Sequence, residues 1–436
     1  MVTSLSQDQI DIVNKTRDAM LSGTPISTLQ RITSKEQPVK GPSWVSRQTY
    51  HAPKVEGNFI SSIVYNAIEA LGDGSERPVD FAVEDVDVRW TGYRAGSQTD
   101  QPEVTINDSE KQKFAKLMSD VKHPVTILYF IGGGFYMNVP ARYHSTTTKL
   151  AQLTGGRCLS FQYRLSPQHT FPAALIDALF TYMSLLYPAP GHFHEPIAPS
   201  SVVFAGDSAG ANLALSLIQV ILSTQSRGEK VQFNGRLEDL PLPGGITALS
   251  AGLDMTYALA SKENIGFDIF NGEWSFHKPE FPSCPLWPSI PPRRHVYCDA
   301  SLMCHPLVSP SIAKSWKGAP PIWFAGGQEV MAGSARLAAQ VIAQDEGSVV
   351  YEEYAEMPHD FPIMSENWPW ALTEDWPQSI RCMEHWAQTC TILSEGRNLK
   401  SKAVFISAGG EETSLDLTNL SGFSLEEAKR MMKESV

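Results

Sequence analysis

A serine with a glycine two residues away on each side has the surroundings of a catalytic nucleophile. Ser208 lies in Gly-Asp-Ser-Ala-Gly, residues 206–210, and no second copy of this pattern occurs in the 436 residues. An apolar run, 201–205, precedes it, and an amphipathic helical pattern, 209–222, follows it. A sharp turn from strand to helix exposes such a serine, and the two glycines avoid steric collision in the turn. We therefore predict that Ser208 is a nucleophile.

A base and an acid are needed to activate a serine hydroxyl, and both are found downstream. His359 follows the apolar run 348–354, which we predict to be a late strand, so a loop there places the imidazole over Ser208. Glu329 lies between the two in sequence, and its carboxylate is our choice to orient the imidazole. Asp254, at the end of another predicted strand, is the alternative acid.

Three consecutive glycines, 132–134, follow the apolar run 124–131. Glycines at a strand end let backbone amides approach a ligand closely, as the stabilisation of an oxyanion requires. Together with the nucleophile, the base and the acid, this loop predicts acyl chemistry at one site.

Short apolar runs alternate with longer helical patterns from about residue 80, which is typical of the α/β class. The predicted strands are 124–131, 158–163, 201–205, 246–250, 321–325 and 348–354. The predicted helices between them are 172–187, 209–222, 334–345 and 378–393. We expect a mostly parallel central sheet flanked by helices, with a helical cap.

The domain organisation follows from the segments that interrupt this alternation. We predict an N-terminal helical cap segment, 1–78, and a catalytic domain, 79–395, with a cap or loop insertion at about 257–303 that is rich in aromatic residues and proline. A C-terminal extension, 396–436, carries a terminal helix, because Ser424 and Glu427 have the spacing of a capping box.

The order and spacing of these motifs resemble the hormone-sensitive-lipase-like branch of the α/β-hydrolases, which includes arylacetamide deacetylases and fungal steryl-acetate hydrolases. The resemblance covers about residues 80–395 and rests on the triple glycine, on YRLSPQH and FPAA at 163–174, on GDSAG and on a late His-x-Phe. It implies an α/β-hydrolase fold with a mostly parallel central sheet of about eight strands. It also implies a serine-dependent carboxylic ester hydrolase, with the backbone amides of Gly133, Gly134 and Ala209 as the oxyanion hole.

Two positions depart from the family pattern. Ile131 stands where the family has a histidine that holds the glycine loop, and Asp360 stands where it more often has glycine. Loss of one oxyanion donor costs about 10²–10³ in rate, so a loosened loop predicts slow turnover or altered chemistry. Together with the aromatic insertion, which would keep water from the site, the departure at Ile131 makes acyl transfer, lactonisation, cyclisation or C–C bond chemistry in secondary metabolism the alternative function. A further hypothesis, from another class, is a non-catalytic ligand receptor.

Aromatic residues near the predicted site favour a wide hydrophobic pocket. We predict that Phe135, Tyr136, Trp274, Trp368 and Trp370 line it, since aromatic side chains are common in ligand pockets. An ester of a bulky hydrophobic molecule is the substrate that such a pocket favours.

Composition excludes several other classes of function. The formal net charge of -12 and the lack of a basic run argue against nucleic acid as a partner. No apolar stretch is long enough for a membrane span, and the first twenty residues do not form a secretory signal. We expect a cytoplasmic enzyme without a cofactor or a metal ion, and a homodimer is an alternative to the monomer.

Overall fold

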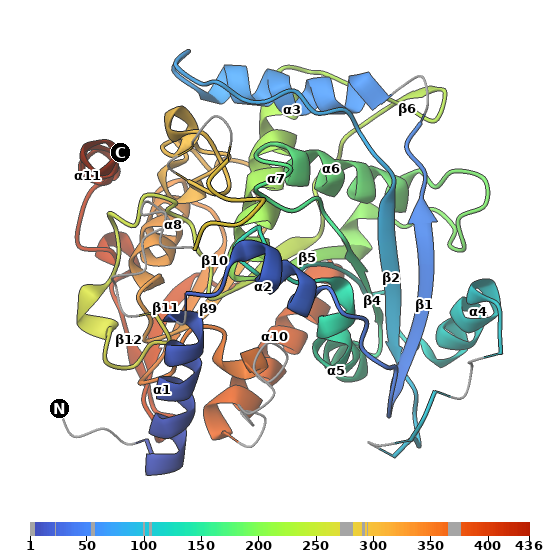
Figure 1. Ribbon diagram of the computed structural model, residues 1–436, viewed down its shortest axis with the longest axis horizontal. Helices are drawn as coiled ribbons and strands as arrows, with labels where there is room; N and C mark the ends of the chain where they lie inside the picture. The colour runs from blue at the N-terminus through green and yellow to red at the C-terminus, as the bar shows by residue number, and fades with distance from the viewer. Residues whose placement is uncertain are drawn as a thin grey trace.

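A ten-stranded sheet runs through the centre of the protein (Figure 1). The computed structural model describes residues 5–21, 23–53, 57–98, 101–103, 107–270, 282–289, 293, 295–364 and 376–436. In spatial order the strands are β1 (Ser43–Tyr50), β2 (Val86–Tyr93), β4 (Arg157–Phe161), β3 (Thr126–Phe130), β5 (Val202–Asp207), β8 (Gly245–Leu249), β9 (Ile322–Gly327), β10 (Val349–Tyr354), β11 (Lys402–Ile406) and β12 (Glu412–Ser414).

The six predicted strands form the parallel centre of this sheet, from β4 across to β10. Their residues are almost entirely buried, as continuous apolar runs require when helices cover both faces. Because parallel strands end at the same edge of a sheet, the loops after β5, β9 and β10 meet there. The predicted fold class is confirmed.

Helices cover both faces of the sheet (Figure 1). Helix α5 (His144–Thr154) packs against α10 (Pro377–Ser394) on one face, and α6 (Ala173–Leu186), α7 (Ser208–Ser226) and α8 (Ala332–Gln344) cover the other. Helix α3 (Gly57–Leu71) lies over α6 and α7 as a further layer. The other α-helices of the described residues are α1 (Gln7–Leu21), α2 (Ile26–Thr33), α4 (Glu110–Asp120) and α11 (Leu425–Ser435), and a separate hairpin joins β6 (Val231–Phe233) to β7 (Arg236–Glu238).

The sheet is larger than the predicted eight strands because its outer strands were not recognised. β1 belongs to the N-terminal segment that we expected to be helical, β2 to the start of the predicted catalytic domain, and β11 and β12 to the C-terminal extension. Within the described residues β1 is an edge strand that pairs with β2, and it carries Ser, Arg, Gln and Thr, so it lacks the apolar run of a central strand. The predicted terminal helix is α11, whose N-cap Ser424 accepts a hydrogen bond from the Glu427 amide.

The N-terminal helices and the insertion meet above the catalytic edge of the sheet. Ile26 of α2, Tyr136 of the glycine loop, and Trp287 and Val296 of the insertion form a small second core. In its described part, the insertion consists of loops, turns and two short 3-10 helices, Lys262–Asn264 and Ala300–Leu302. Among the described residues, no helix has both the length and the apolar character needed to cross a lipid bilayer.

Candidate active site

The turn between β5 and α7 places Ser208 at the catalytic edge of the sheet. β5 ends at Asp207 and α7 begins at Ser208, whose φ of 51° lies in the left-handed region that non-glycine residues rarely adopt. A Cβ on Gly210 would lie only 2.0 Å from the carbonyl oxygen of Phe130, so β3 approaches the turn too closely for any side chain there. The strand, turn and helix expected around Ser208 are all present.

The imidazole of His359 lies over Ser208 from the loop after β10. His359 Nε2 is 2.9 Å from Ser208 Oγ, and the imidazole is buried. His359 Nδ1 is 2.8 Å from Oε2 of Glu329, which comes from the loop after β9. Since an ionised carboxylate only accepts, Nδ1 carries the proton and Nε2 can accept the one on Ser208. The fold thus brings Ser208 to a base and an acid that lie more than a hundred positions after it in the sequence.

Glu329, rather than the alternative Asp254, is the acid that the fold brings to the imidazole. Burial raises the pKa of Glu329, and the neighbouring imidazole acts in the opposite direction. The carboxylate of Asp254 accepts hydrogen bonds from the amides of Thr256, at 2.7 Å, and Leu259, at 2.9 Å. Asp254 therefore shapes the loop after β8.

Asp360 adds a second carboxylate to the imidazole. Its backbone has a φ of 55°, a conformation that aspartate tolerates better than most residues and that explains the family's preference for glycine. Asp360 Oδ2 lies 3.3 Å from His359 Nε2. Burial by itself would lower the pKa of His359, but the carboxylates of Asp360 and Glu329 outweigh it and raise that pKa.

The glycine loop curls beside Ser208 in a conformation that only glycine adopts easily. Gly133 has a φ of 121° and Gly134 a φ of 59°. The Gly132 amide donates to Asp207 Oδ1 at 3.1 Å, so it is committed to holding the loop. Gly134 and Ala209 both line the cavity next to Ser208. Two of the three residues predicted for the oxyanion hole, Gly134 and Ala209, thus lie beside Ser208, and the oxyanion hole of Gly133, Gly134 and Ala209 stays a prediction.

A buried network holds the loop in the absence of the family histidine. Asp207 accepts hydrogen bonds from the hydroxyls of Tyr129, at 2.9 Å, and Tyr143, at 3.1 Å, as well as from Gly132. Burial raises the pKa of Asp207 to about 6 even though the three hydrogen-bond donors act in the opposite direction. Charge-assisted hydrogen bonds of this kind are about twice as strong as neutral ones.

Further bonds tie the loop carbonyls to the same network. Asn138 Nδ2 donates to the Gly132 carbonyl and to the Tyr143 hydroxyl, both at 3.3 Å, and the Tyr163 hydroxyl donates to the Ile131 carbonyl at 3.0 Å. Ile131 itself is fully buried in the core. The loosened loop expected from Ile131 is therefore not what the structure has, because tyrosines from other elements anchor the loop.

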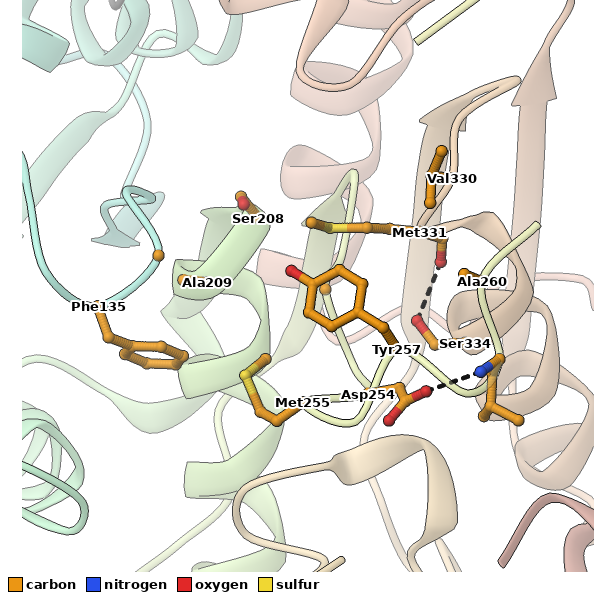
Figure 2. Close-up of a pocket in the computed structure, with 13 residues that line it drawn as sticks. Phe135, Ser208, Ala209, Asp254, Met255, Tyr257, Ala260, Val330, Met331 and Ser334 are labelled. Carbon is orange, nitrogen blue, oxygen red and sulfur yellow. Dashed lines mark hydrogen bonds between the residues drawn. The ribbon is translucent and has the colours of Figure 1, made fainter. Parts of the chain in front are cut away.

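A small cavity opens beside Ser208 (Figure 2). Ser208 lies at the start of α7, and the Met331 side chain reaches toward it from the opposite side, while the Tyr257 ring lies below Met331 in this view with its hydroxyl on the side of Ala209 (Figure 2). The lining is mostly apolar and comes from the glycine loop, the start of α7 and the loops after β8 and β9: Gly134, Phe135, Ser208, Ala209, Gly252, Asp254, Met255, Tyr257, Leu259, Ala260, Val330, Met331 and Ser334.

Of the predicted pocket residues, Phe135 lines this cavity and Tyr136 does not. Tyr136 packs against Ile26 and Trp287 in the second core, because the two neighbours point to different sides of the tight glycine loop. Trp274, Trp368 and Trp370 lie outside the described residues. Met255, Tyr257 and Met331 were missed, although their positions directly after predicted strands were a usable signal.

Comparison with known proteins agrees with this geometry. Residues 127–363 match the alpha/beta hydrolase fold family over more than half of the chain. The chain belongs to the α/β-hydrolases. The resemblance inferred from the motifs is confirmed. Because one fold can carry many different functions, the chemistry of this α/β-hydrolase must be argued from its own site residues.

Individual relatives of this α/β-hydrolase are esterases by name. An acetyl-hydrolase from Streptomyces hygroscopicus is 28% identical over 54% of this chain and 67% of that protein. The versiconal hemiacetal acetate esterase of Emericella nidulans is 34% identical over 26% of this chain, and the match spans only 36% of that protein. A bacterial esterase of the hormone-sensitive lipase family shares the fold, with a TM-score of 0.57 and 17% identity over 90% of this chain and 100% of that chain.

We expect Tyr143→Phe to lower kcat roughly tenfold with little change in KM. The substitution removes one hydrogen-bond donor to Asp207 and so loosens the glycine loop, but it leaves every oxyanion donor in place. Complete loss of an oxyanion donor lowers kcat by about 10²–10³-fold, so a smaller effect is expected here. Steady-state kinetics on p-nitrophenyl acetate measures the effect. Tyr187→Phe is the matched control, because the Tyr187 hydroxyl bonds to the Asp239 carbonyl at an exposed position. Equal kcat in the two variants would contradict a role for Tyr143 in the loop.

We expect Asp360→Asn to move the acid limb of the kcat/KM pH profile to lower pH by about one unit. His359 must be neutral to accept a proton, and loss of a nearby negative charge makes its neutral form easier to reach. Asp85→Asn is the control, because Asp85 forms a similar pair with His51 on the surface, at 2.8 Å. An unchanged acid limb in Asp360→Asn would show that this carboxylate does not act on His359.

Proposed function

We propose that this α/β-hydrolase cleaves carboxylic esters through an acyl-enzyme on Ser208. The observation that carries the proposal is the continuous chain of hydrogen bonds from Ser208 Oγ through His359 to Glu329, at 2.9 and 2.8 Å. These distances are within the range in which a base takes a proton from a serine hydroxyl. The glycine loop and the N-terminus of α7 supply amides for the oxyanion.

In the first half of the reaction, Ser208 Oγ attacks the ester carbonyl carbon while its proton passes to His359 Nε2. The oxyanion accepts hydrogen bonds from the amides of Gly133, Gly134 and Ala209, and Glu329 balances the imidazolium charge. Collapse of this intermediate breaks the bond to the alcohol oxygen, which takes the proton from His359. Water then repeats the sequence on the acyl-enzyme and releases the acid.

The positions of base and cavity distinguish the acyl side of the substrate from the alcohol side. The leaving oxygen must receive its proton from His359 Nε2, so the alcohol portion lies on the His359 side. The cavity touches Ser208, Ala209 and Gly134, and His359 is not among its lining residues in the described part of the chain. The acyl portion therefore occupies the cavity, and the alcohol extends past His359 and the Phe270 ring that packs against it.

The cavity is small enough to restrict the acyl group. Its volume, as bounded by the described residues, is about 30 Å³. A cavity needs roughly 10–15 Å³ to hold one water molecule, so this cavity holds about two or three groups of that size. An acetyl group fits this volume better than a long acyl chain. The word acetate or acetyl in the names of two relatives supports the same assignment.

The substrate we propose is thus a short-chain ester, such as an acetate, of a hydrophobic alcohol. The bulky part of the molecule predicted from the aromatic residues belongs to the alcohol. Acyl transfer as the alternative rested on the Ile131 departure and on the aromatic cap. The network around Asp207 removes the first of these two reasons, because it holds the oxyanion loop without the family histidine. Hydrolysis is accordingly the activity to test first.

We expect Ser208→Ala to lower the hydrolysis of p-nitrophenyl acetate by at least about 10⁴-fold. A fluorophosphonate probe should label the wild-type protein and leave the variant unlabelled, because it reacts with an activated serine. Ser226→Ala, at the other end of α7, is the control and should keep both activities. An unlabelled, inactive wild-type protein would instead favour the non-catalytic receptor.

We expect the wild-type enzyme to prefer p-nitrophenyl acetate over the octanoate, and Met331→Ala to shift this preference toward longer chains. Each methylene that fits or fails to fit an apolar pocket changes kcat/KM by about 10–200-fold, so the butyrate-to-acetate ratio should rise at least tenfold. Met431→Ala, a partly buried methionine on α11, is the control. A wild-type preference for octanoate would disprove the short acyl site.

A further inference from the structure

Asp268 of the insertion is a buried carboxylate that contacts the loops of both the acid and the base. Its side chain is fully buried. Oδ2 accepts a hydrogen bond from the Val330 amide at 2.6 Å, directly after Glu329, and Oδ1 accepts one from the His359 amide at 3.0 Å. One carboxylate thus joins two loops that come from different strands.

The same insertion segment holds the acid loop at two further points. Asn264 Nδ2 donates to the Glu329 carbonyl at 2.9 Å, and the Ser261 amide donates to the Val330 carbonyl at 2.8 Å. The backbone of Glu329 and Val330 is therefore bonded on both its donor and its acceptor sides. This arrangement restricts the direction in which the Glu329 side chain can approach the imidazole.

The N-terminal helix anchors the segment that carries Asp268. Arg17 of α1 donates through Nε to the Asp268 carbonyl at 3.0 Å and through Nη2 to the Ile265 carbonyl at 3.1 Å. Two residues after Asp268, the Phe270 ring meets the His359 ring edge to face, with centroids 4.9 Å apart. A chain of direct contacts therefore leads from α1 through the insertion to the imidazole.

We propose that Asp268 is a positioning residue that fixes the loops of Glu329 and His359 relative to each other and that Arg17 holds it in place. The proposal rests on the function proposed for Ser208, His359 and Glu329. Asp268 touches none of the reacting atoms. Its carboxylate accepts backbone donors from both loops, and charge-assisted bonds in a buried site are stronger and more directional than neutral ones.

Asp268→Asn tests the proposal because it keeps the shape of the side chain but replaces one of its two acceptor oxygens by an NH2 group. That group is a donor, so it cannot accept the hydrogen bond of the backbone N–H that it faces. We expect kcat on p-nitrophenyl acetate to fall about 10²-fold with KM within twofold, since misplacing a catalytic group by about 1 Å costs that much. Asp299→Asn, which alters a helix-capping aspartate elsewhere in the insertion, is the control and should keep wild-type kcat.

The pH profile separates positioning from a general loss of stability. The charged groups that face His359 are Glu329, Asp360, Asp268 and Asp207. With the other three intact, Asp268→Asn should move the acid limb of kcat/KM to lower pH, whereas partial unfolding would scale the whole profile. Arg17→Met should lower kcat severalfold. It should not move the acid limb to lower pH, because loss of a positive charge does not lower the pKa of His359.

The outcomes distinguish the two proposals. A wild-type enzyme that loses activity in Ser208→Ala, together with wild-type kcat and acid limb in Asp268→Asn, would overturn the role of Asp268 and leave the function intact. An inactive wild-type protein would overturn the function and the role with it. If Asp268→Asn does not fold, a normal kcat in Arg17→Met would overturn the positioning chain.

Discussion

The structure depends on one buried imidazole that must contact two partners at once. His359 is useful only if Nδ1 faces Glu329 while Nε2 faces Ser208, and both contacts are made within 2.9 Å. Neither partner is near it in sequence, so the constraint falls on the fold. Parallel strands meet it, because β5, β9 and β10 end at one edge and deliver their following loops to the same place.

Burial makes this arrangement effective and also demanding. In a site of low dielectric, charges act strongly on each other, and unpaired polar groups are costly. Glu329, Asp268 and Asp207 each accept hydrogen bonds from backbone amides, hydroxyls or the imidazole, so their charges are balanced by directed donors. The same groups that hold the loops therefore also set the electrostatic environment of the base.

The protein reaches this geometry with supports that differ from the family pattern. Where the family histidine is replaced by Ile131, Tyr129 and Tyr143 bind Asp207 and keep the glycine loop curled. The segment that covers the site does more than enclose it, because its Asn264 and Asp268 bond directly to the acid and base loops. Covering the site and orienting its residues are thus tasks of the same piece of chain.

The sequence by itself determined the central sheet, the covering helices and the residues that meet around Ser208. These follow from local signals: apolar runs of strand length, helical periodicity, and glycines at fixed distances from the serine. Only the tertiary structure decided the outer strands β1, β2, β11 and β12, the side to which Tyr136 points, and the contacts of Asp268 with residues 62 and 91 positions away. Such contacts carry no local signal, because an aspartate in an irregular loop has the same sequence surroundings whether it meets solvent or two catalytic loops.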